Sequence, residues 1–345
     1  MNEGIMFVIG CGALIGGIDR ILGNRLGLGQ KFEEGFQLMG ATALSMAGII
    51  CLAPVLAGLL SYLITPVFSL AGCILAIDMG GYQLSMGLAH EMSIGAFSGI
   101  IASSMAGCTL VFTIPVGMKV IAEHDRSDFL KGISAGLIGM PVGLLIGGLV
   151  QGLSFLTVLH QSLPVIVLSI ILLYGLLRHT EKTVSVFSAF ASFVQAVATV
   201  GLTIGAFQYI TGIILFPSIA PLTQAMETVA SIAIVMLGSL PLAELFRRVL
   251  HRPLTWLGKH TGMNDEAVTG MIVGSITVMP SVVMMKDMNP KGRIMTGAFL
   301  VCGAAVIGAH LGFAAGTQPQ LITALLSGKL AGALAGMSIA LLLSR

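Results

Sequence analysis

Residues 132–157 read GISAGLIGMPVGLLIGGLVQGLSFLT, a stretch without a charged side chain. A helix that crosses the hydrocarbon core of a bilayer needs about 20 such residues. Lipid offers no hydrogen bonds, so a backbone that faces it must pair its own polar groups, as an α-helix does. This stretch therefore predicts a transmembrane helix.

The rest of the chain has the same character. Of its 345 residues, 56% are hydrophobic and only 9% are charged, whereas a soluble domain carries about 25% charged residues. Strand-type alternation is absent, so the sequence predicts an all-α polytopic membrane protein of roughly ten transmembrane helices. We expect one integral membrane domain, 1–345, in which some segments are re-entrant or broken. Apolar runs lie near residues 5–18, 36–61, 64–77, 79–89, 93–122, 132–157, 163–177, 184–207, 209–223, 228–246, 267–285, 294–316 and 320–343. The first of these lacks a basic flank and a cleavage site, which favours a retained membrane segment over a signal peptide.

Glycines recur at four-residue spacing in several of these runs, which predicts closely packed helices. The sustained series are Gly139/Gly143/Gly147, Gly308/Gly312/Gly316 and Gly328/Gly332/Gly336.

The basic residues gather in a few loops, near 119–131, 178–182, 247–259 and 286–293. The positive-inside rule places such loops in the cytoplasm, and the uncharged turns near 158–163 and 316–320 outside. The run 267–285 lies between two basic loops, and a single span cannot return to the side on which it began. We therefore expect 267–285 to be re-entrant and to line the transport pathway, where irregular backbone is tolerated.

A few ionisable residues lie where charge is costly, at about 3 kcal/mol or more for a bare charge at mid-bilayer. Asp78 lies in CILAIDMGGYQLSMGL, His310 in AAVIGAHLGFAAG and Lys329 in TALLSGKLAGALAG. Glu33 and Glu34 stand together before a long apolar run. Such residues usually face a cavity or a partner, and Gly80 and Gly81 allow the helix to unwind beside Asp78.

Each of these residues also has a purely structural interpretation. Asp78 and Lys329 form an ion pair, or Lys329 reaches the membrane surface; His310 is a hydrogen-bonded packing residue. Glu33 and Glu34 mark a helix N-terminus, where the dipole favours acids. Glu34 and Asp78 are 44 residues apart, as are Glu266 and His310. This weak echo suggests an internal repeat with pseudo-repeat halves 1–150 and 200–345, as in many transporters.

Several function classes are disfavoured. The net charge of +2 gives no basic field for nucleic acid. Metalloprotease and P-loop signatures are absent, the cysteines lack metal-type spacing, and no dinucleotide fingerprint follows a strand. The sequence therefore favours a transporter or channel for a small solute over an enzyme, with no cofactor and no metal. A membrane scaffold or sensor is a weaker alternative.

Runs spread over nearly the whole chain resemble the ethanolamine utilization transport protein family, EutH. They are IDRIL (18–22), KFEEGFQLMGA (31–41), LAPVL (52–56), DMGGYQL (78–84), TLVFTIPVG (109–117), MMKDM (284–288), HLGFAAG (310–316) and GKLAGALAG (328–336). The resemblance implies a bacterial inner-membrane permease that admits protonated ethanolamine, chiefly at acidic pH, and feeds ethanolamine catabolism.

For such a substrate, Asp78 is the expected partner of the ammonium group. Gln83, Tyr82 or Thr277 would contact the hydroxyl, with Glu34, His310 and Lys329 as further candidates for the binding site. Facilitated diffusion is the expected mechanism, and an ion-coupled symporter of another small polar or cationic solute is the alternative. The partners are then ethanolamine and the lipid bilayer, with no nucleic acid and the oligomeric state open.

Overall fold

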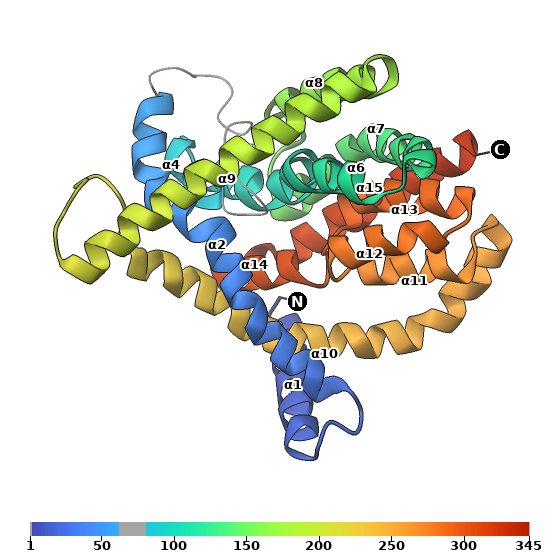
Figure 1. Ribbon diagram of the computed structural model, residues 1–345, viewed down its shortest axis with the longest axis horizontal. Coiled ribbons are helices and arrows are strands. Elements are labelled where there is room, and N and C mark those ends of the chain that lie inside the picture. Colours follow the sequence, from blue (N-terminus) through green and yellow to red (C-terminus); the bar gives the residue numbers. More distant parts are fainter. Residues whose placement is uncertain (1, 62–80, 345) are drawn as a thin grey trace.

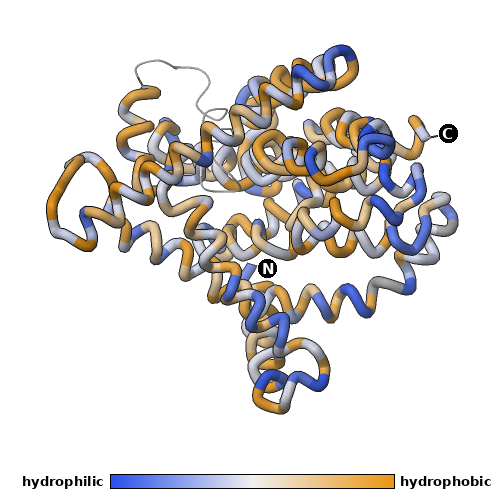
Figure 2. Tube along the Cα trace, in the orientation of Figure 1, coloured by the Kyte–Doolittle hydropathy of each residue, from blue (hydrophilic) through white to orange (hydrophobic). Residues whose placement is uncertain are grey.

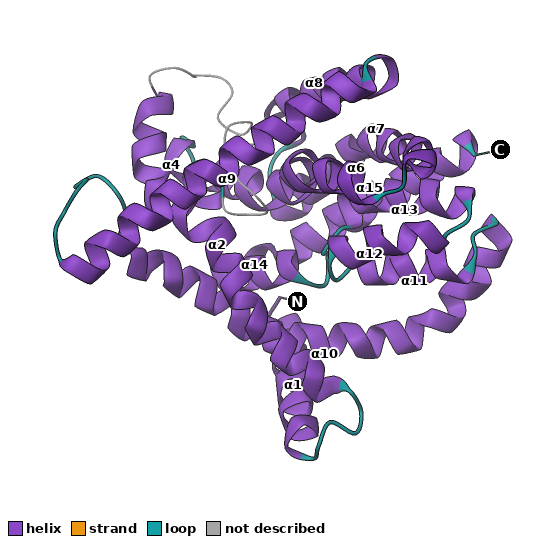
Figure 3. Cartoon of the chain, in the orientation of Figure 1, coloured by secondary structure: helices purple, strands orange, loops and turns teal. Residues whose placement is uncertain are grey.

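The computed structural model describes residues 2–61 and 81–344, and every regular element within that part of the chain is helical (Figures 1 and 3). Eight helices there are long and apolar enough to cross a membrane. The prediction of an all-α polytopic membrane protein is therefore confirmed. The eight candidate spans are Asn2–Ile21, Leu28–Leu60, Met92–Val120, Glu123–Gln151, Phe155–Arg178, Thr180–Thr211, Leu222–Val249 and Pro319–Leu343.

Many large apolar side chains are exposed, and hydrophobic residues recur along the helices (Figure 2). On α8 (Phe155–Arg178), for example, Ile170 and Ile171 are each about three-fifths exposed. Exposing these side chains to water would be unfavourable, whereas exposing them to lipid costs no free energy. The exposed apolar belt is the surface that a bilayer covers.

Glycines bring α7 (Arg126–Gln151) and α15 (Ile322–Leu343) close together in the interior. A Cβ added to Gly139 would collide with the backbone of Gly336, and one added to Gly143 would lie 2.7 Å from the carbonyl oxygen of Gly328. The predicted glycine series in these two segments therefore forms a helix–helix contact, because only hydrogen side chains permit this separation.

The run 267–285 is divided into α11 (Asp265–Gly274) and α12 (Val278–Met284), which form a hairpin. Its two ends are joined: Asn264 Nδ2 donates to the Asp287 carbonyl at 2.9 Å, and Asn289 Nδ2 donates to the Gly262 carbonyl at 2.8 Å. The chain thus returns to the side from which the hairpin starts, as the flanking basic loops predicted. The next segment is also interrupted, between α13 (Pro290–Gly303) and α14 (Ala309–Thr317).

Hydrogen bonds sort the loops into two groups at opposite ends of the spans. At one end Asn2 Nδ2 donates to the Gln320 carbonyl at 2.6 Å, and Gln151 Nε2 donates to the Ser93 carbonyl at 2.7 Å. At the other end Arg248, on α10 (Leu222–Thr261), donates to the Leu26 carbonyl. There too, Arg293 forms ion pairs with Asp125 and Asp128, at 3.0 and 3.1 Å. The second group, called the basic side below, contains the basic loops that we expect in the cytoplasm.

Candidate functional site

The break between α11 and α12 lies against the break between α13 and α14, and this meeting of two breaks is called the crossing below. The Ala305 N–H donates to the Gly274 carbonyl and the Ile307 N–H to the Ser275 carbonyl, each at 2.9 Å. Ala305 has a φ of +51°, and an added Cβ on Gly308 would overlap the carbonyl oxygen of Ile276. Backbone groups freed by the two breaks are therefore partly paired with each other, which an apolar environment requires.

Two predicted site residues flank this crossing. Thr277 lies in the break between α11 and α12, half-buried and with extended backbone. His310 lies in the first turn of α14, and its side chain is buried. Discontinuous helices that meet in this way form the substrate sites of many transporters, because their unwound backbone and half-helix ends offer polar groups at membrane depth.

Lys329 is the most deeply buried charge in the described part of the chain, with none of its surface exposed. Its Nζ donates to the Ser104 carbonyl at 2.8 Å. Ser104 belongs to the π-helix η1 (Phe97–Gly107), all of which is buried. Lys329 therefore does not reach the membrane surface, so that alternative is wrong. Its proposed partner, Asp78, lies outside the described residues.

Tyr82, in the short helix α4 (Tyr82–Leu88), connects η1 to α14. Its hydroxyl accepts a hydrogen bond from Gln318 Nε2 at 2.7 Å, and its ring lies edge-on to Phe313, with centroids 5.6 Å apart. A Cβ on Gly99 of η1 would come within 2.8 Å of the Tyr82 Cα. Gln83, beside it, is half-buried. Sequence reasoning missed Gln318; its position in an uncharged turn just after the HLGFAAG run was the available signal.

Glu34 lies apart from these groups, near the beginning of α2 (Leu28–Ser61). Its carboxylate pairs with Lys31 at 2.5 Å, and that of Glu33 pairs with Arg20 at 2.5 Å. The interpretation that these acids mark a helix N-terminus is wrong, because α2 begins at Leu28 and its first turn contains no acid. The two carboxylates are neutralised by basic side chains rather than by the helix dipole.

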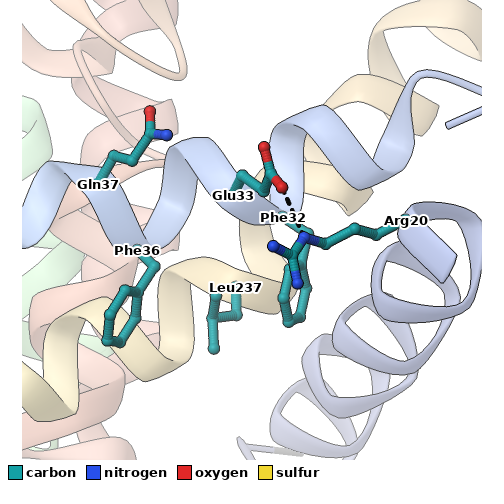
Figure 4. A pocket seen from close by; sticks show the side chains of 6 residues that line it. All are labelled: Arg20, Phe32, Glu33, Phe36, Gln37 and Leu237. Atoms are coloured by element: carbon teal, nitrogen blue, oxygen red, sulfur yellow. Dashed lines mark hydrogen bonds and ion pairs between the residues drawn. The ribbon is translucent and has the colours of Figure 1, made fainter. Parts of the chain in front are cut away.

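A cavity of about 350 Å³ opens beside Glu33 (Figure 4). It is lined by Arg20, Phe32, Glu33, Phe36, Gln37 and Leu237. A larger apolar cavity of about 590 Å³ is lined in part by Val306 and Ile307, which belong to the break before α14. The break before α14 thus borders a space lined mainly by apolar side chains.

Residues 132–136 read Gly-Ile-Ser-Ala-Gly, which has the spacing of a hydrolase nucleophile elbow. They lie inside α7 and follow no strand. That elbow needs a sharp strand-to-helix turn to expose its serine, so Ser134 is a helix-packing residue.

The spanning helices, the hairpin and the crossed interruptions define a polytopic membrane protein with the architecture of a transporter. The family model for "Ethanolamine utilisation protein, EutH" matches residues 1–343, and the chain belongs to this family.

Several curated proteins are similar over nearly their whole length. A probable ethanolamine permease EutH of Listeria monocytogenes is 39% identical over 98% of this chain and 93% of its own. One from Escherichia coli is 35% identical over 99% of this chain and 95% of its own. The uncharacterized protein YxeR of Bacillus subtilis is 38% identical over 96% and 92%. No solved structure matches the chain.

Proposed function

We propose that this protein is a permease through which ethanolamine enters the bacterial cell across the inner membrane, feeding ethanolamine catabolism. The family and the names of its relatives support the substrate. The structural observation that carries the proposal is the crossing of two interrupted segments beside buried His310.

Such a permease contributes the largest share of ethanolamine uptake under acidic conditions. Ethanolamine is a primary amine, and amines of this type have pKa values in the range of roughly 8–10. Only the uncharged fraction crosses lipid unaided, and that fraction falls about tenfold for each pH unit below the pKa. A protein path for the cation then carries most of the flux, and facilitated diffusion is sufficient when metabolism consumes the product.

The substrate has an ammonium group and a hydroxyl, so the path needs a carboxylate and neutral polar groups. We assign the ammonium to Asp78, which lies outside the described residues. The hydroxyl is assigned to Tyr82 with Gln83, or to Thr277, and His310 borders the same crossing. Glu34 is left out, because its carboxylate is engaged by Lys31 away from the crossing.

Lys329 cannot bind the ammonium group of the substrate, because its own side chain is a cation and has no acceptor. Its own primary ammonium already occupies the Ser104 carbonyl. We assign it the role of a fixed cation that holds the π-helix in shape and sets the charge of the pathway.

The order of elements supports the proposal of two repeated halves, 1–150 and 200–345. A long helix, a hairpin or short helix, an interrupted helix and a glycine-rich span follow one another in α10 to α15, and in α2, α4, η1 and α7. The long helices begin at Leu28 and Leu222, and the last spans at Arg126 and Ile322, an offset of about 195 residues in both cases. The echo between Glu34 and Glu266 has a larger offset and relates unlike helices. The pairs α2 with α10 and α7 with α15 pack together, so binding would lie between the halves.

Uptake of labelled ethanolamine into proteoliposomes at pH 5 and pH 7 tests the proposal. The wild type should carry ethanolamine at both pH values, with the largest excess over protein-free vesicles at pH 5. Asp78→Asn should abolish that excess while the protein stays folded, whereas Asp265→Asn, at the start of α11 on the basic side, should not. Wild-type uptake by Asp78→Asn would eliminate the assignment of the ammonium partner.

An ion-coupled symporter is the second candidate, since broken helices also hold coupling ions. Accumulation against a gradient that collapses with an ionophore would support it. Equilibration to equal concentrations on both sides would support facilitated diffusion.

A further inference from the structure

The cavity of Figure 4 lies beside the end of α1 (Asn2–Ile21) that belongs to the basic side, and it shares no lining residue with the crossing of the interrupted helices. Four of its residues come from two consecutive turns of α2, with the Phe32 and Phe36 rings on one side of the helix and the Glu33 and Gln37 side chains on the other (Figure 4). Arg20 from the last turn of α1 and Leu237 from α10 close the remaining sides. The cavity is thus built by three helices and not by one loop.

The chemistry of its lining is specific. Glu33 supplies a carboxylate, Phe32 and Phe36 supply two aromatic rings, and Gln37 supplies a carboxamide one helical turn beyond Glu33. A carboxylate with an aromatic ring binds an ammonium group by charge and by cation–π attraction. A carboxamide offers both a donor and an acceptor to a hydroxyl.

We propose that this cavity is a second binding site for an ethanolammonium group, distinct from the site at the crossing. The ammonium would lie against Glu33 and the rings, and the oxygen would contact Gln37. This inference rests on the proposed function for the identity of the ligand, and it adds a site at the end of the pathway that faces the basic side.

In the structure, the Arg20 guanidinium occupies the position on the Glu33 carboxylate that the ligand's ammonium group would take. Its Nε lies 2.5 Å from Glu33 Oε1, and the two side chains are 58% and 43% exposed. An ion pair this exposed is weak, so an incoming ammonium can replace Arg20 on the carboxylate. Ethanolamine has only four non-hydrogen atoms, so its dissociation constant can be no tighter than about tens of micromolar. That is suitable for a site that must release its ligand.

The ethanolammonium group has two sources at this position. One is free ethanolamine in transit, and the other is the headgroup of phosphatidylethanolamine in the surrounding leaflet. Both present the same ammonium and neighbouring oxygen, so a membrane of defined composition is needed to separate them.

Two substitutions should shift the half-saturating concentration in opposite directions. Flux is measured in each direction across proteoliposomes made of phosphatidylglycerol and phosphatidylcholine, without ethanolamine lipids. Glu33→Gln should raise the half-saturating ethanolamine concentration on the basic side by about 2- to 5-fold, and Arg20→Gln should lower it. The value on the opposite side should stay unchanged. Glu34→Gln is the matched control, because Glu34 has the same type of ion pair but does not line the cavity.

The outcomes separate a failure of the proposed function from a failure of the second binding site. If the wild type carries no ethanolamine, the proposed function fails. If it does, and Glu33→Gln and Arg20→Gln shift the constant in the same direction or behave like Glu34→Gln, the pair is structural and the second site is overturned. Added phosphatidylethanolamine then identifies the source. A headgroup in the cavity raises the wild-type constant towards that of Glu33→Gln, whereas no change means that free ethanolamine occupies the site.

Discussion

Two segments of the described chain, the π-helix η1 and the break before α14, handle their backbone differently. In η1 the chain stays helical with wider turns, and a side chain from another helix, Lys329, binds the Ser104 carbonyl. In the break before α14 the helix stops altogether between Gly303 and Ala309. There the freed N–H groups of Ala305 and Ile307 bind carbonyls of the neighbouring hairpin.

The difference shows two ways to keep polar backbone at membrane depth. A widened helix needs little from its surroundings, and one ammonium group is enough at Ser104. A broken helix exposes more polar groups and needs a second broken helix as its partner. A charged group thus contacts the backbone of η1, whereas the break before α14 is closed by backbone groups of the hairpin that approach it closely.

Gly308→Ala should have the largest effect, because it removes that close approach. The added Cβ would overlap the carbonyl oxygen of Ile276, a backbone atom that cannot rotate away. We expect loss of folded protein in detergent and uptake reduced at least about tenfold. Gly312→Ala is the matched control, since the nearest atom to its Cβ would be in the flexible Met236 side chain, at 3.0 Å, and Ile232 would lie at an ordinary contact distance of 3.6 Å. Equal yield and uptake in both variants would show that the crossing tolerates separation.

Lys329→Met tests the dependence of η1 on this charge, and it should separate stability from activity. The substitution ends the cost of burying an ammonium but leaves the Ser104 carbonyl without that donor, so with a methionine of similar length the melting temperature should change little. Uptake should fall about 10- to 100-fold, because losing a hydrogen bond made by a charged group changes an equilibrium by about that factor. Melting is followed by fluorescence of a thiol- or lipid-sensitive dye, and uptake is measured in proteoliposomes.

A second variant decides the role of the lysine. Lys329→Arg retains the charge and should keep part of the activity, although the guanidinium is larger. If Lys329→Met melts at a much lower temperature and its remaining folded fraction transports normally, Lys329 is a structural residue and not a determinant of the pathway.

Much of the fold followed from the sequence, because lipid leaves few alternatives for an apolar run. The return of 267–285 to its own side followed from two basic loops, and the α7–α15 contact from glycines at four-residue spacing. The site was less accessible. Lys329 was expected to pair with Asp78 or to reach the membrane surface, and its hydrogen bond to the Ser104 carbonyl, 225 residues away, could not be predicted because every residue has a carbonyl.

Other details depended on packing rather than pattern. The π-helical form of residues 97–107 has no compositional signal, since its residues suit an α-helix equally well. Gln318 becomes relevant only because α14 carries it to Tyr82. Glu33 and Glu34 look alike in the sequence, yet Glu33 lines the cavity of Figure 4 and Glu34 does not.

Tyr82→Phe should have the smallest effect, and it bears on both regions because Tyr82 lies against η1 at Gly99 and against α14 at Phe313. The ring keeps its contact with Phe313 and Gly99, and only the hydroxyl that accepts from Gln318 Nε2 is lost. A neutral hydrogen bond contributes about 0.5–1.5 kcal/mol. The half-saturating ethanolamine concentration should therefore rise by about 2- to 10-fold, with folded yield unchanged.

A double-mutant cycle with Gln318→Leu shows whether this hydroxyl serves the substrate or the fold. If the bond only joins α4 to the end of α14, the two single variants lower the melting temperature and the double variant adds little further, since the bond is lost once. If Tyr82 also contacts the substrate hydroxyl, Tyr82→Phe raises the half-saturating concentration in the Gln318→Leu background as well. The Tyr82 hydroxyl then belongs to the pathway, because it acts on transport after its structural partner has been removed.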